Sequence, residues 1–331
     1  MKTICLIEGD GIGHEVIPAA AAVLAALQPS WKLISAEAGY DCFRRSGESL
    51  PARTLELARG ADAVLFGAAT SPSVPVAGFR SAIRTLRREL DLFANLRPAL
   101  SLPLEGHRPG TDLLLVRENS EGAYVAQERR YGDLAIADVV ITRAASLRIG
   151  EVAAREALRR RGRLTVVHKA NVLPVSQGLF RQSVLEAAAG FAGLEIEERI
   201  VDAAAMELVM HPERFDVLVM TNLLGDVLSD LCAGLVGGLG LAPSANLGTV
   251  HALFEPVHGS APDIAGRGVA NPSAALLSLA LLLEHLGQAT AAQRLRRALL
   301  ASLQAGVRTP DLGGQATTDQ LTGAVLERLG T

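Results

Sequence analysis

The sequence predicts an α/β fold with a mainly parallel sheet, and two observations support this prediction. Short runs of β-branched and other apolar residues alternate along the chain with segments of helical periodicity. The chain has 331 residues, 49% of them apolar, which is enough for two domains or one elaborated α/β unit. Strands that alternate with helices are typical of parallel sheets whose faces are covered by helices.

The order of the expected elements defines two candidate domains. Strands are expected at 4–8, 32–38, 63–68, 112–118, 164–169, 195–201 and 217–222. The clearest helices are at 146–161, 176–189 and 272–286; Asn271 and Pro272 are the expected N-cap and first residue of the last one, which stops at Gly287. Segments 96–98 and 237–243 are the candidate crossings between domains. They predict one domain of residues 1–97 and 240–331, and a second of residues 98–239.

Composition excludes several classes of function. The net charge is −3, and basic residues are scattered except at 159–163, so no nucleic-acid footprint is apparent. Cys5, Cys42 and Cys232 fit neither a disulfide framework nor a paired-cysteine zinc site. The apolar start is too short for a signal peptide, and the longest apolar stretch cannot span a bilayer. We expect a cytoplasmic protein that binds neither nucleic acid nor a membrane.

A glycine-rich turn follows the first expected strand, at residues 9–14. It is similar to a dinucleotide-binding fingerprint, but that fingerprint requires glycine where this chain has His14. A tight turn that uses the conformational freedom of glycine explains the motif equally well. Pro18 further restricts the following helix to a late start or a kink. A phosphate site at this helix N-terminus is therefore not established.

Asp226 and Asp230 lie four residues apart, on one face of an expected helix that follows a strand. Like charges at this spacing repel by a few tenths of a kcal/mol unless a cation lies between them. A solvated acidic face is the alternative, but the flanking residues are apolar and glycine-rich, which indicates a mostly buried element. Carboxylates without nearby His or Cys favour Mg²⁺ or Mn²⁺ over zinc.

Arginines from three elements are candidates for one anion site. Arg84, Arg87 and Arg88 share a helix face, which alone is more typical of a solvated basic surface. Arg97 precedes a proline, and Arg117 lies near the end of an expected strand. Guanidinium groups that converge from separate elements would suit a substrate with several carboxylates, because each can form a bidentate pair.

Polar residues also follow the ends of the other strands, where open α/β sheets place their chemistry. Lys169 and Asn171 come after one strand, and Asp202 comes directly after another. Tyr124 is either an acid or a packing aromatic, and we expect a structural role for His168. Each of these residues also has an ordinary structural explanation.

The segment 255–263 is a loop rich in proline and small residues. Its backbone N–H groups could cradle an anionic ligand. Asp263 could then bind a ribose diol, and its charge would repel a 2′-phosphate.

Six ordered blocks, at 6–15, 91–98, 116–124, 168–171, 221–230 and 255–272, resemble the β-decarboxylating dehydrogenases of isocitrate, isopropylmalate and homoisocitrate. The resemblance runs from residue 4 to about residue 318. It implies an isopropylmalate dehydrogenase-like two-domain fold, with mainly parallel central sheets flanked by helices, and not a Rossmann fold. Residues 1–97 and 240–331 would form the larger, cofactor-binding domain, and residues 98–239 would carry the dimer interface, an arm and the metal-site residues.

The resemblance also implies roles for single residues. Asp226 and Asp230 would bind Mg²⁺ or Mn²⁺ together with Asp202 of a second subunit. Lys169, also from the partner, would take the substrate hydroxyl proton, and Tyr124 would protonate the enol after decarboxylation. The implied substrate-binding residues are Ser71, Arg84, Arg87, Arg97, Arg117, Tyr124, Lys169 and Asn171. The active site would then require a homodimer, with a tetramer left open.

The cofactor implied by the resemblance is NAD, bound on the 255–271 loop and not on the turn at 9–14. Asp263 followed by Ile264 is similar to the NAD-using members, whereas NADP-using members carry Lys-Tyr there. Ile12 would lie near the nicotinamide. The other implied contacts are Ala69, Thr70, Ser71, Asn171, Glu255, His258, Gly259, Ser260, Ala261, Asp263, Ile264 and Asn271.

Arg84 occupies the position that would select the substrate. It resembles homoisocitrate dehydrogenases, where an arginine meets the extra distal carboxylate; an isopropyl group there would leave a charge unpaired, a penalty of roughly several kcal/mol. The reaction implied is homoisocitrate to 2-oxoadipate, in lysine biosynthesis by the aminoadipate route. Isocitrate stays open as a second substrate. The alternatives are an isocitrate, 3-isopropylmalate or tartrate dehydrogenase, and a non-catalytic regulatory subunit, which the presence of Lys169 and Tyr124 disfavours.

Overall fold

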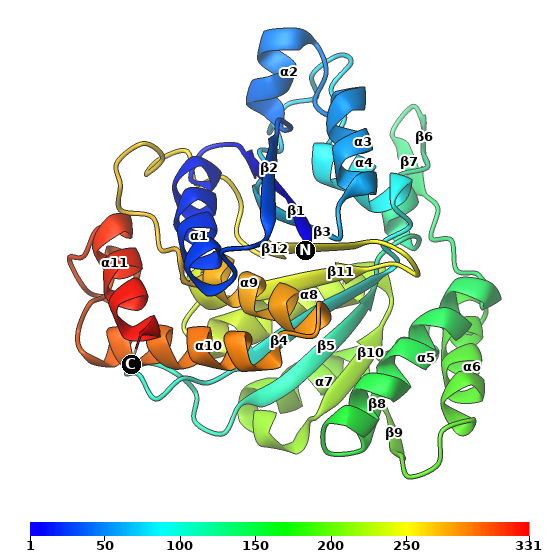
Figure 1. Ribbon diagram of the computed structural model, residues 1–331. Coiled ribbons are helices and arrows are strands. Elements are labelled where there is room, and N and C mark those ends of the chain that lie inside the picture. The colour runs from blue at the N-terminus through cyan, green and yellow to red at the C-terminus, as the bar shows by residue number, and fades with distance from the viewer. Residues whose placement is uncertain (331) are drawn as a thin grey trace. The chain divides into compact units, whose positions relative to one another are not determined.

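Two compact units, each with five strands flanked by helices, organise residues 1–330, the part of the chain that the computed structural model describes (Figure 1). The first unit comprises Met1–Leu92, Leu102–Leu104 and Gly237–Thr331, and the second comprises Phe93–Ser101 and Glu105–Val236. Residue 331, the last residue of the expected first domain, lies outside the described residues. The α/β class with mainly parallel sheets is confirmed.

The first unit contains five strands in the order β2-β1-β3-β12-β11. They are β1 (Thr3–Gly9), β2 (Lys32–Ala36), β3 (Ala63–Ala68), β11 (Pro243–Leu247) and β12 (Ala252–Pro256). All neighbouring pairs are parallel except β11 with β12. Its helices are α1 (Gly13–Leu27), α2 (Tyr40–Ser46), α3 (Ala52–Gly60), α4 (Ala82–Glu89), α9 (Ser273–His285), α10 (Ala289–Gln304) and α11 (Thr318–Leu329), with short 3-10 turns at Leu239–Leu241 and Pro310–Leu312.

Both faces of this sheet are covered. Alternate residues of β1 and β3, such as Ile7 and Phe66, share a core with Ala58 of α3 and Leu86 of α4. Helices α1 and α9 pack on the other face, and α10 and α11 pack against them. The carboxyl ends of β1 and β3 therefore open into the turns that carry the expected cofactor residues.

The second unit contains five strands in the order β4-β5-β10-β8-β9. They are β4 (Ala94–Leu100), β5 (Asp112–Glu118), β8 (Arg163–His168), β9 (Glu195–Ile200) and β10 (Val217–Met220). Only β4 and β5 pair in antiparallel fashion. Its helices are α5 (Arg143–Arg159), α6 (Ser176–Ala189), α7 (Val201–Met210) and α8 (Asn222–Leu235), with 3-10 turns at Ala123–Val125 and Pro212–Arg214.

Helices α7 and α8 share a core with this second sheet that includes Leu208, Leu218 and Leu228. On the other side, α5 packs on β5 and β10 and α6 packs on β8. A separate hairpin of β6 (Glu128–Tyr131) and β7 (Leu134–Ala137) has all eight strand residues exposed. Two strands without a covered face are only marginally stable in water, so this hairpin receives little support from its own chain.

The expected elements are largely confirmed, with three corrections. The last expected helix begins at Ser273 and ends at His285, so its N-cap is Pro272 and not Asn271. Asn271 still accepts a hydrogen bond from the Ser273 N–H at 2.9 Å. Helix α1 begins at Gly13 with Pro18 inside it, so the late start is wrong. Finally, Glu255 and Pro256 belong to β12 and not to a loop, because they pair with Ser244 and Pro243 of β11.

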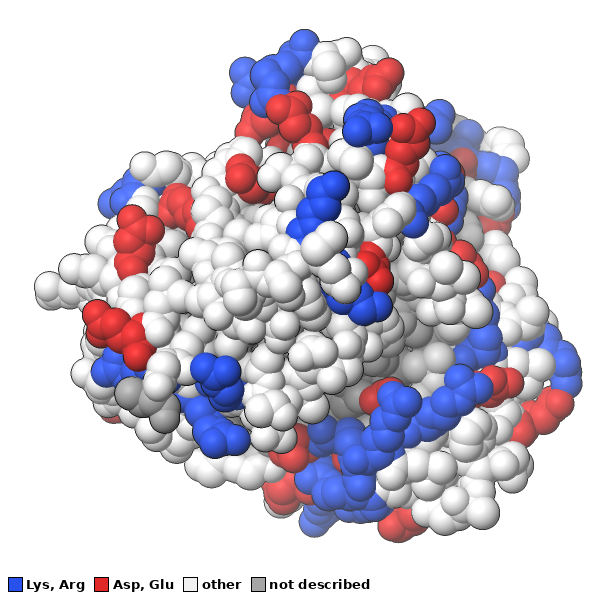
Figure 2. Space-filling model, in the orientation of Figure 1, with Lys and Arg blue, Asp and Glu red and all other residues white. Residues whose placement is uncertain are grey.

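Acidic and basic side chains lie next to one another at several places on the face seen in Figure 2, which also shows a broad uncharged area and a group of basic side chains at the lower right. The arginines of the 159–163 run are paired with acids: Arg160 contacts Asp112 and the buried Asp216, and Arg163 contacts Glu195. No helix within residues 1–330 is long and apolar enough to cross a membrane.

Candidate active site

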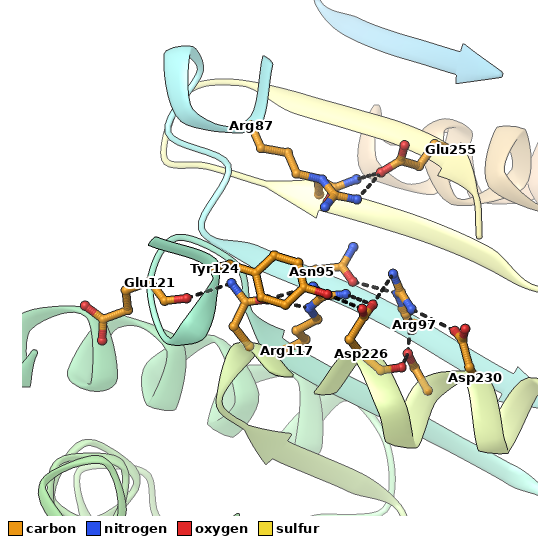
Figure 3. A network of polar contacts seen from close by, with 12 residues as sticks. Arg87, Asn95, Arg97, Arg117, Glu121, Tyr124, Asp226, Asp230 and Glu255 are labelled. Atoms are coloured by element: carbon orange, nitrogen blue, oxygen red, sulfur yellow. Dashed lines mark hydrogen bonds and ion pairs between the residues drawn. The ribbon is translucent and has the colours of Figure 1, made fainter. Parts of the chain in front are cut away.

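Helix α8 carries the two acids that the sequence singled out. It begins directly after β10, so the spacing from Asp226 to Asp230 places both carboxylates on one face, as expected. Arg97, from β4, contacts both: its guanidinium lies 3.5 Å from Asp226 Oδ1 and 3.2 Å from Asp230 Oδ1 (Figure 3). The repulsion between the two carboxylates is thus offset by a shared cation from the same unit.

Arg97 is itself held in place by two polar side chains. Its Nε donates to Asn95 Oδ1 at 2.8 Å, and one terminal nitrogen donates to Ser229 Oγ at 2.5 Å. Asn95 is fully buried, and Arg97 and Ser229 are nearly so. The guanidinium is therefore oriented before any ligand binds.

Arg117 is the largest fully buried side chain of the described residues. It ion-pairs with Asp226, and its Nε and Nη2 both donate to Asn222 Oδ1, at 2.9 and 2.7 Å. Gly225 makes room for it, because a Cβ at Gly225 would lie 2.6 Å from the Arg117 Cγ. The sequence places Arg117 at the end of a strand, and Asn222 and Asp226 of α8 accept the hydrogen bonds and ion pair that orient it.

Tyr124 joins the same network from the 3-10 turn after β5. Its hydroxyl donates to Asp226, and the guanidinium carbon of Arg117 lies 4.9 Å from the centre of its ring. Burial and the hydrogen bond to Asp226 raise the pKa of the Tyr124 hydroxyl. A phenol held protonated beside a cluster of cations and carboxylates is suited to donate a proton.

The two acids of α8 titrate differently. Burial opposes ionisation of Asp226, but the charge of Arg117, the hydrogen bond from Tyr124 and the charge of Arg97 outweigh it and lower its pKa. Burial raises the pKa of Asp230, because Arg97 only partly compensates for it and Asp226 adds to the increase. Two adjacent carboxylates with one side exposed form a set of hard oxygen donors that fits Mg²⁺ or Mn²⁺.

Lys169 and Asp202 form a pair of their own within the second unit. The Lys169 ammonium contacts Asp202 Oδ1 at 2.5 Å, and this contact is the main cause of a lowered pKa of Asp202. Asp202 is the second residue of α7 and does not directly follow a strand, because β9 ends at Ile200. Within residues 1–330 no three His, Cys, Asp or Glu side chains are placed to hold a metal, so Asp202 does not join Asp226 and Asp230 in one chain. Asn171, two residues after Lys169, is exposed.

In the first unit, Arg87 of α4 contacts Glu255 of β12 at 2.8 Å (Figure 3). The same Glu255 oxygen accepts from the buried Asn246 at 2.7 Å. Arg84, one turn earlier on α4, is exposed and forms no hydrogen bond or ion pair with any described residue. Arg84 is therefore available to an external anion.

The expected cofactor residues of the first unit come from three neighbouring turns. Ile12 lies in the turn after β1; Ala69, Thr70 and Ser71 follow β3; and residues 258–271 follow β12. The turns contact one another: the Ile12 N–H donates to Ser260 O at 2.9 Å, and Thr70 Oγ1 donates to Ser260 Oγ at 2.7 Å.

Two features of the 258–271 segment fit a dinucleotide. The buried His258 Nε2 has no hydrogen-bond partner among the described residues, and burial lowers the pKa of this histidine. A neutral imidazole with one free ring nitrogen is suited to hydrogen-bond an uncharged heterocycle. Asp263 is exposed and unpaired, as a carboxylate that binds a ribose diol requires.

Four polar residues that orient the expected site residues were missed from the sequence: Asn95, Asn222, Ser229 and Asn246. Asn222 has a recognisable signal, because it is a polar residue between a buried strand and an apolar helix. Asn95 lies two residues before Arg97 on β4, a spacing that places both side chains on one face of a strand. Ser229 and Asn246 occupy positions that give no sign of which arginine or acid they contact.

Comparison with protein families agrees with the sequence blocks. Residues 3–325 match the family described as "Isocitrate/isopropylmalate dehydrogenase". The match covers both units and therefore almost the whole chain.

Comparison with individual proteins gives the same family. The chain is 60% identical over 327 residues to a protein of Thermus thermophilus named isocitrate/homoisocitrate dehydrogenase, with 98% of each chain covered. It is 46% identical to a 3-isopropylmalate dehydrogenase of Methanothermobacter thermautotrophicus, again over 98% of each. Among solved structures, it is similar to an isocitrate dehydrogenase from Methylococcus capsulatus, with a TM-score of 0.94, 42% identity and complete coverage of both chains.

Proposed function

The chain belongs to the isocitrate/isopropylmalate dehydrogenase family of β-decarboxylating enzymes, and on that premise we propose that it oxidises homoisocitrate to 2-oxoadipate and CO₂. We propose NAD as the oxidant and Mg²⁺ or Mn²⁺ as the metal. Lysine biosynthesis by the aminoadipate route is the pathway that would use this reaction. Isocitrate is proposed as a second substrate, because the 60% identical relative is named for both acids.

The observation that carries the choice of substrate is the unpaired, exposed Arg84 on α4. Homoisocitrate has a distal carboxylate on a longer arm, and an arginine with no partner in its own chain can pair with it bidentately. The isopropyl group of isopropylmalate has neither a hydrogen-bond acceptor nor a negative charge for that guanidinium.

The chain's own residues would share the chemistry as follows. Arg97 and Arg117, oriented by Asn95 and Asn222, would bind the carboxylates of the malate part of the substrate. Arg87 would add a third guanidinium from the first unit. When the substrate binds, each of these arginines would pair with a substrate carboxylate in place of a carboxylate of its own chain.

Lys169 would take the proton from the C2 hydroxyl, and Tyr124 would return a proton to C3 after CO₂ leaves. A bound Mg²⁺ or Mn²⁺ would supply Lewis acidity at the C2 oxygen, and NAD would accept the hydride. Asp226 and Asp230 would hold the metal from one subunit and Asp202 from the other.

A homodimer is proposed because Lys169 and Asp202 lie apart from Asp226 in one chain, among exposed apolar residues. Val175, 85% exposed, follows Lys169 closely, and Met206, 58% exposed, lies one turn after Asp202 on α7. Val227 on α8 is 61% exposed, and α7 and α8 pack together. Exposed apolar groups on neighbouring elements are typical of an interface. The exposed β6–β7 hairpin would gain its missing support there.

The substrate is tested by steady-state NADH formation from homoisocitrate, isocitrate and 3-isopropylmalate, with wild-type protein and Arg84→Leu. We expect the highest kcat/KM for homoisocitrate, and a decrease of roughly 10²-fold in Arg84→Leu because a charge-assisted bidentate pair is lost. Arg53→Leu, which removes an exposed arginine of α3, is the control. A highest wild-type kcat/KM for 3-isopropylmalate would refute the assignment.

Sharing of the site between subunits is tested by mixing two inactive variants, Lys169→Met and Tyr124→Phe. After unfolding and refolding together, half of the dimers are mixed, and each mixed dimer regains one intact site. About a quarter of wild-type activity is then expected from this symmetry. If each site is built from one chain, the mixture stays inactive.

A further inference from the structure

The turn between β1 and α1, with three glycines and Asp10, and Glu15 in the first turn of α1 are not explained by the reaction chemistry. We propose that Asp10 and Glu15 are positioning residues that hold the dinucleotide loop, residues 257–272, in its binding conformation. The inference rests on the proposed use of a nicotinamide dinucleotide and adds the residues that control its affinity. Hydrogen bonds of the first unit that hold both ends of the loop carry it.

Ser260, near the start of the loop, is held by the turn between β1 and α1. The Ile12 N–H donates to Ser260 O at 2.9 Å. Gly11 has a φ of +55°, and a Cβ there would lie 2.1 Å from Ser260 O. Glycine is therefore required at residue 11 for the approach of this loop, and not for the approach of a phosphate group.

Asp10 holds Thr70, a second residue that contacts Ser260. Its carboxylate is 1% exposed and accepts three backbone N–H groups, from Tyr40 at 2.9 Å, Asp41 at 2.8 Å and Thr70 at 2.8 Å. Thr70 in turn donates through its hydroxyl to Ser260 Oγ at 2.7 Å. Asp10 thus sets the position of Thr70, and Thr70 sets that of Ser260.

Glu15 holds the C-terminal half of the loop. Its Oε1 accepts from the Gly266 N–H at 2.8 Å, and its Oε2 accepts from the Ala270 N–H at 3.4 Å. Thr318 of α11 completes this end, because its N–H donates to Gly268 O at 2.9 Å and its hydroxyl to Ala270 O at 2.7 Å. One carboxylate therefore contacts two amides of the loop.

Between these anchors the loop has only short-range support. Its internal backbone hydrogen bonds run from Ile264 and Ala265 to Ala261 O and from Arg267 to Ile264 O. Asp263, which is expected to bind a ribose diol, and Ile264, another expected cofactor contact, lie in that middle part. Loss of an anchor would let this part sample other positions, and binding would then include the free energy of ordering it. The carboxylates and arginines of the second unit do not enter these contacts, so the effect belongs to the cofactor alone.

The test compares Glu15→Ala and Glu15→Gln with wild-type protein, and uses Glu327→Ala, an exposed acid of α11, as the control. The readouts are hydrogen exchange of the 260–270 amides without cofactor, the Kd for NADH and NADPH by fluorescence titration, and the kinetic constants. In Glu15→Ala we expect exchange of Gly266 and a Kd for NADH each increased about tenfold, which corresponds to one lost hydrogen bond to a charged group. The kcat at saturating NAD and the KM of the hydroxy acid should change less than about twofold.

Glu15→Gln should recover most of the affinity, because its amide oxygen can still accept from Gly266. Faster exchange without weaker NADH binding would overturn the proposal, as would an unchanged exchange rate. A parallel loss of kcat, hydroxy-acid KM and Tm in both Glu15 variants would indicate a general defect in folding and also overturn it. If wild-type protein binds NADPH but not NADH, the proposed cofactor is refuted, and the role of Glu15 is tested by the same titrations with NADPH. If wild-type protein binds neither dinucleotide, both the proposed cofactor and the proposed role of Glu15 are refuted.

Discussion

The polar networks of the two units differ in what their acids contact. In the second unit, Asp226 is held by the side chains of Arg97, Arg117 and Tyr124, groups that a metal and a substrate would also engage. In the first unit, Asp10 and Glu15 contact mainly backbone N–H groups that no ligand needs. On the proposed function, a metal or substrate would replace contacts among side chains of the second unit, whereas the dinucleotide would meet a turn and a loop of the first unit that are already held in place.

The largest effect is expected when Asp226, the acid at the centre of the second unit's polar network, is replaced. Asp226→Asn removes a proposed metal ligand and leaves the buried Arg117 without a full counter-charge. We expect kcat/KM to decrease by roughly 10³-fold, together with a weaker Mg²⁺ affinity, as measured by kinetics and calorimetric titration. Asp112→Asn, which removes another arginine-paired acid of the second unit, should leave both values unchanged.

The same variant has a defined pH dependence of stability. Because the pKa of Asp226 is lowered in the folded protein, its ionised form contributes stability above its ordinary pKa of 3.8, and this contribution is lost as the pH falls through the lower folded value. Wild-type protein should therefore exceed Asp226→Asn in Tm at pH 6, and the difference should shrink below about pH 4. A difference that persists unchanged at pH 3 would contradict the pairing with Arg117.

A smaller effect, restricted to the cofactor, is expected for Gly11→Ala in the first unit. The new Cβ would overlap Ser260 O, and the positive φ would add about 1–2 kcal/mol of backbone strain. We expect the KM for NAD to increase by more than about tenfold with little change for the hydroxy acid. Gly47→Ala is the matched control, since Gly47 has a φ of +81° but no atom within 4 Å of an added Cβ. An equal change of KM in both variants would remove the role of the Ser260 contact.

The smallest effect is expected for Thr70→Val, which removes the hydroxyl contact with Ser260 and keeps the Thr70 N–H on Asp10. One neutral hydrogen bond is worth about 1 kcal/mol, so the KM for NAD should increase about fivefold. Thr54→Val removes a comparable hydroxyl bond, to Glu37 O, elsewhere in the first unit, and should leave the KM unchanged. If both variants behave alike, the Thr70 contact does not support the loop.

Much of the fold could be predicted from the sequence because buried parallel strands form continuous apolar runs. Each of the seven expected strands begins and ends within two residues of the corresponding observed strand. Strand β4 was missed because it contains Arg97 and Pro98, and proline within a strand ordinarily argues against a central position. Strand β12 was missed in part because Glu255 and Pro256 resemble loop residues, although Glu255 is buried against Arg87.

The candidate site was less predictable than the fold. The spacing of Asp226 and Asp230 reveals their common face, because it depends on helix geometry alone. Nothing local indicates that Arg117 pairs with Asp226, since β5 and α8 are separated by about a hundred residues of chain. The roles of Asn95 and Asn246 are local instead: Asn95 lies two residues before Arg97 on β4, and Asn246 contacts Glu255 across the β11–β12 pair, but none of these three strands was predicted.

The isolation of Arg84 has an evolutionary consequence. A residue without contacts in its own chain can be exchanged with almost no loss of stability, whereas Arg97 or Arg117 cannot change without leaving a buried acid or amide unsatisfied. On the proposed role of Arg84, descendants of one ancestral enzyme could acquire new hydroxy acids by substitutions on α4, while selection kept the charged network constant. Relatives named for different acids yet matched along nearly their entire length are what such a history would leave.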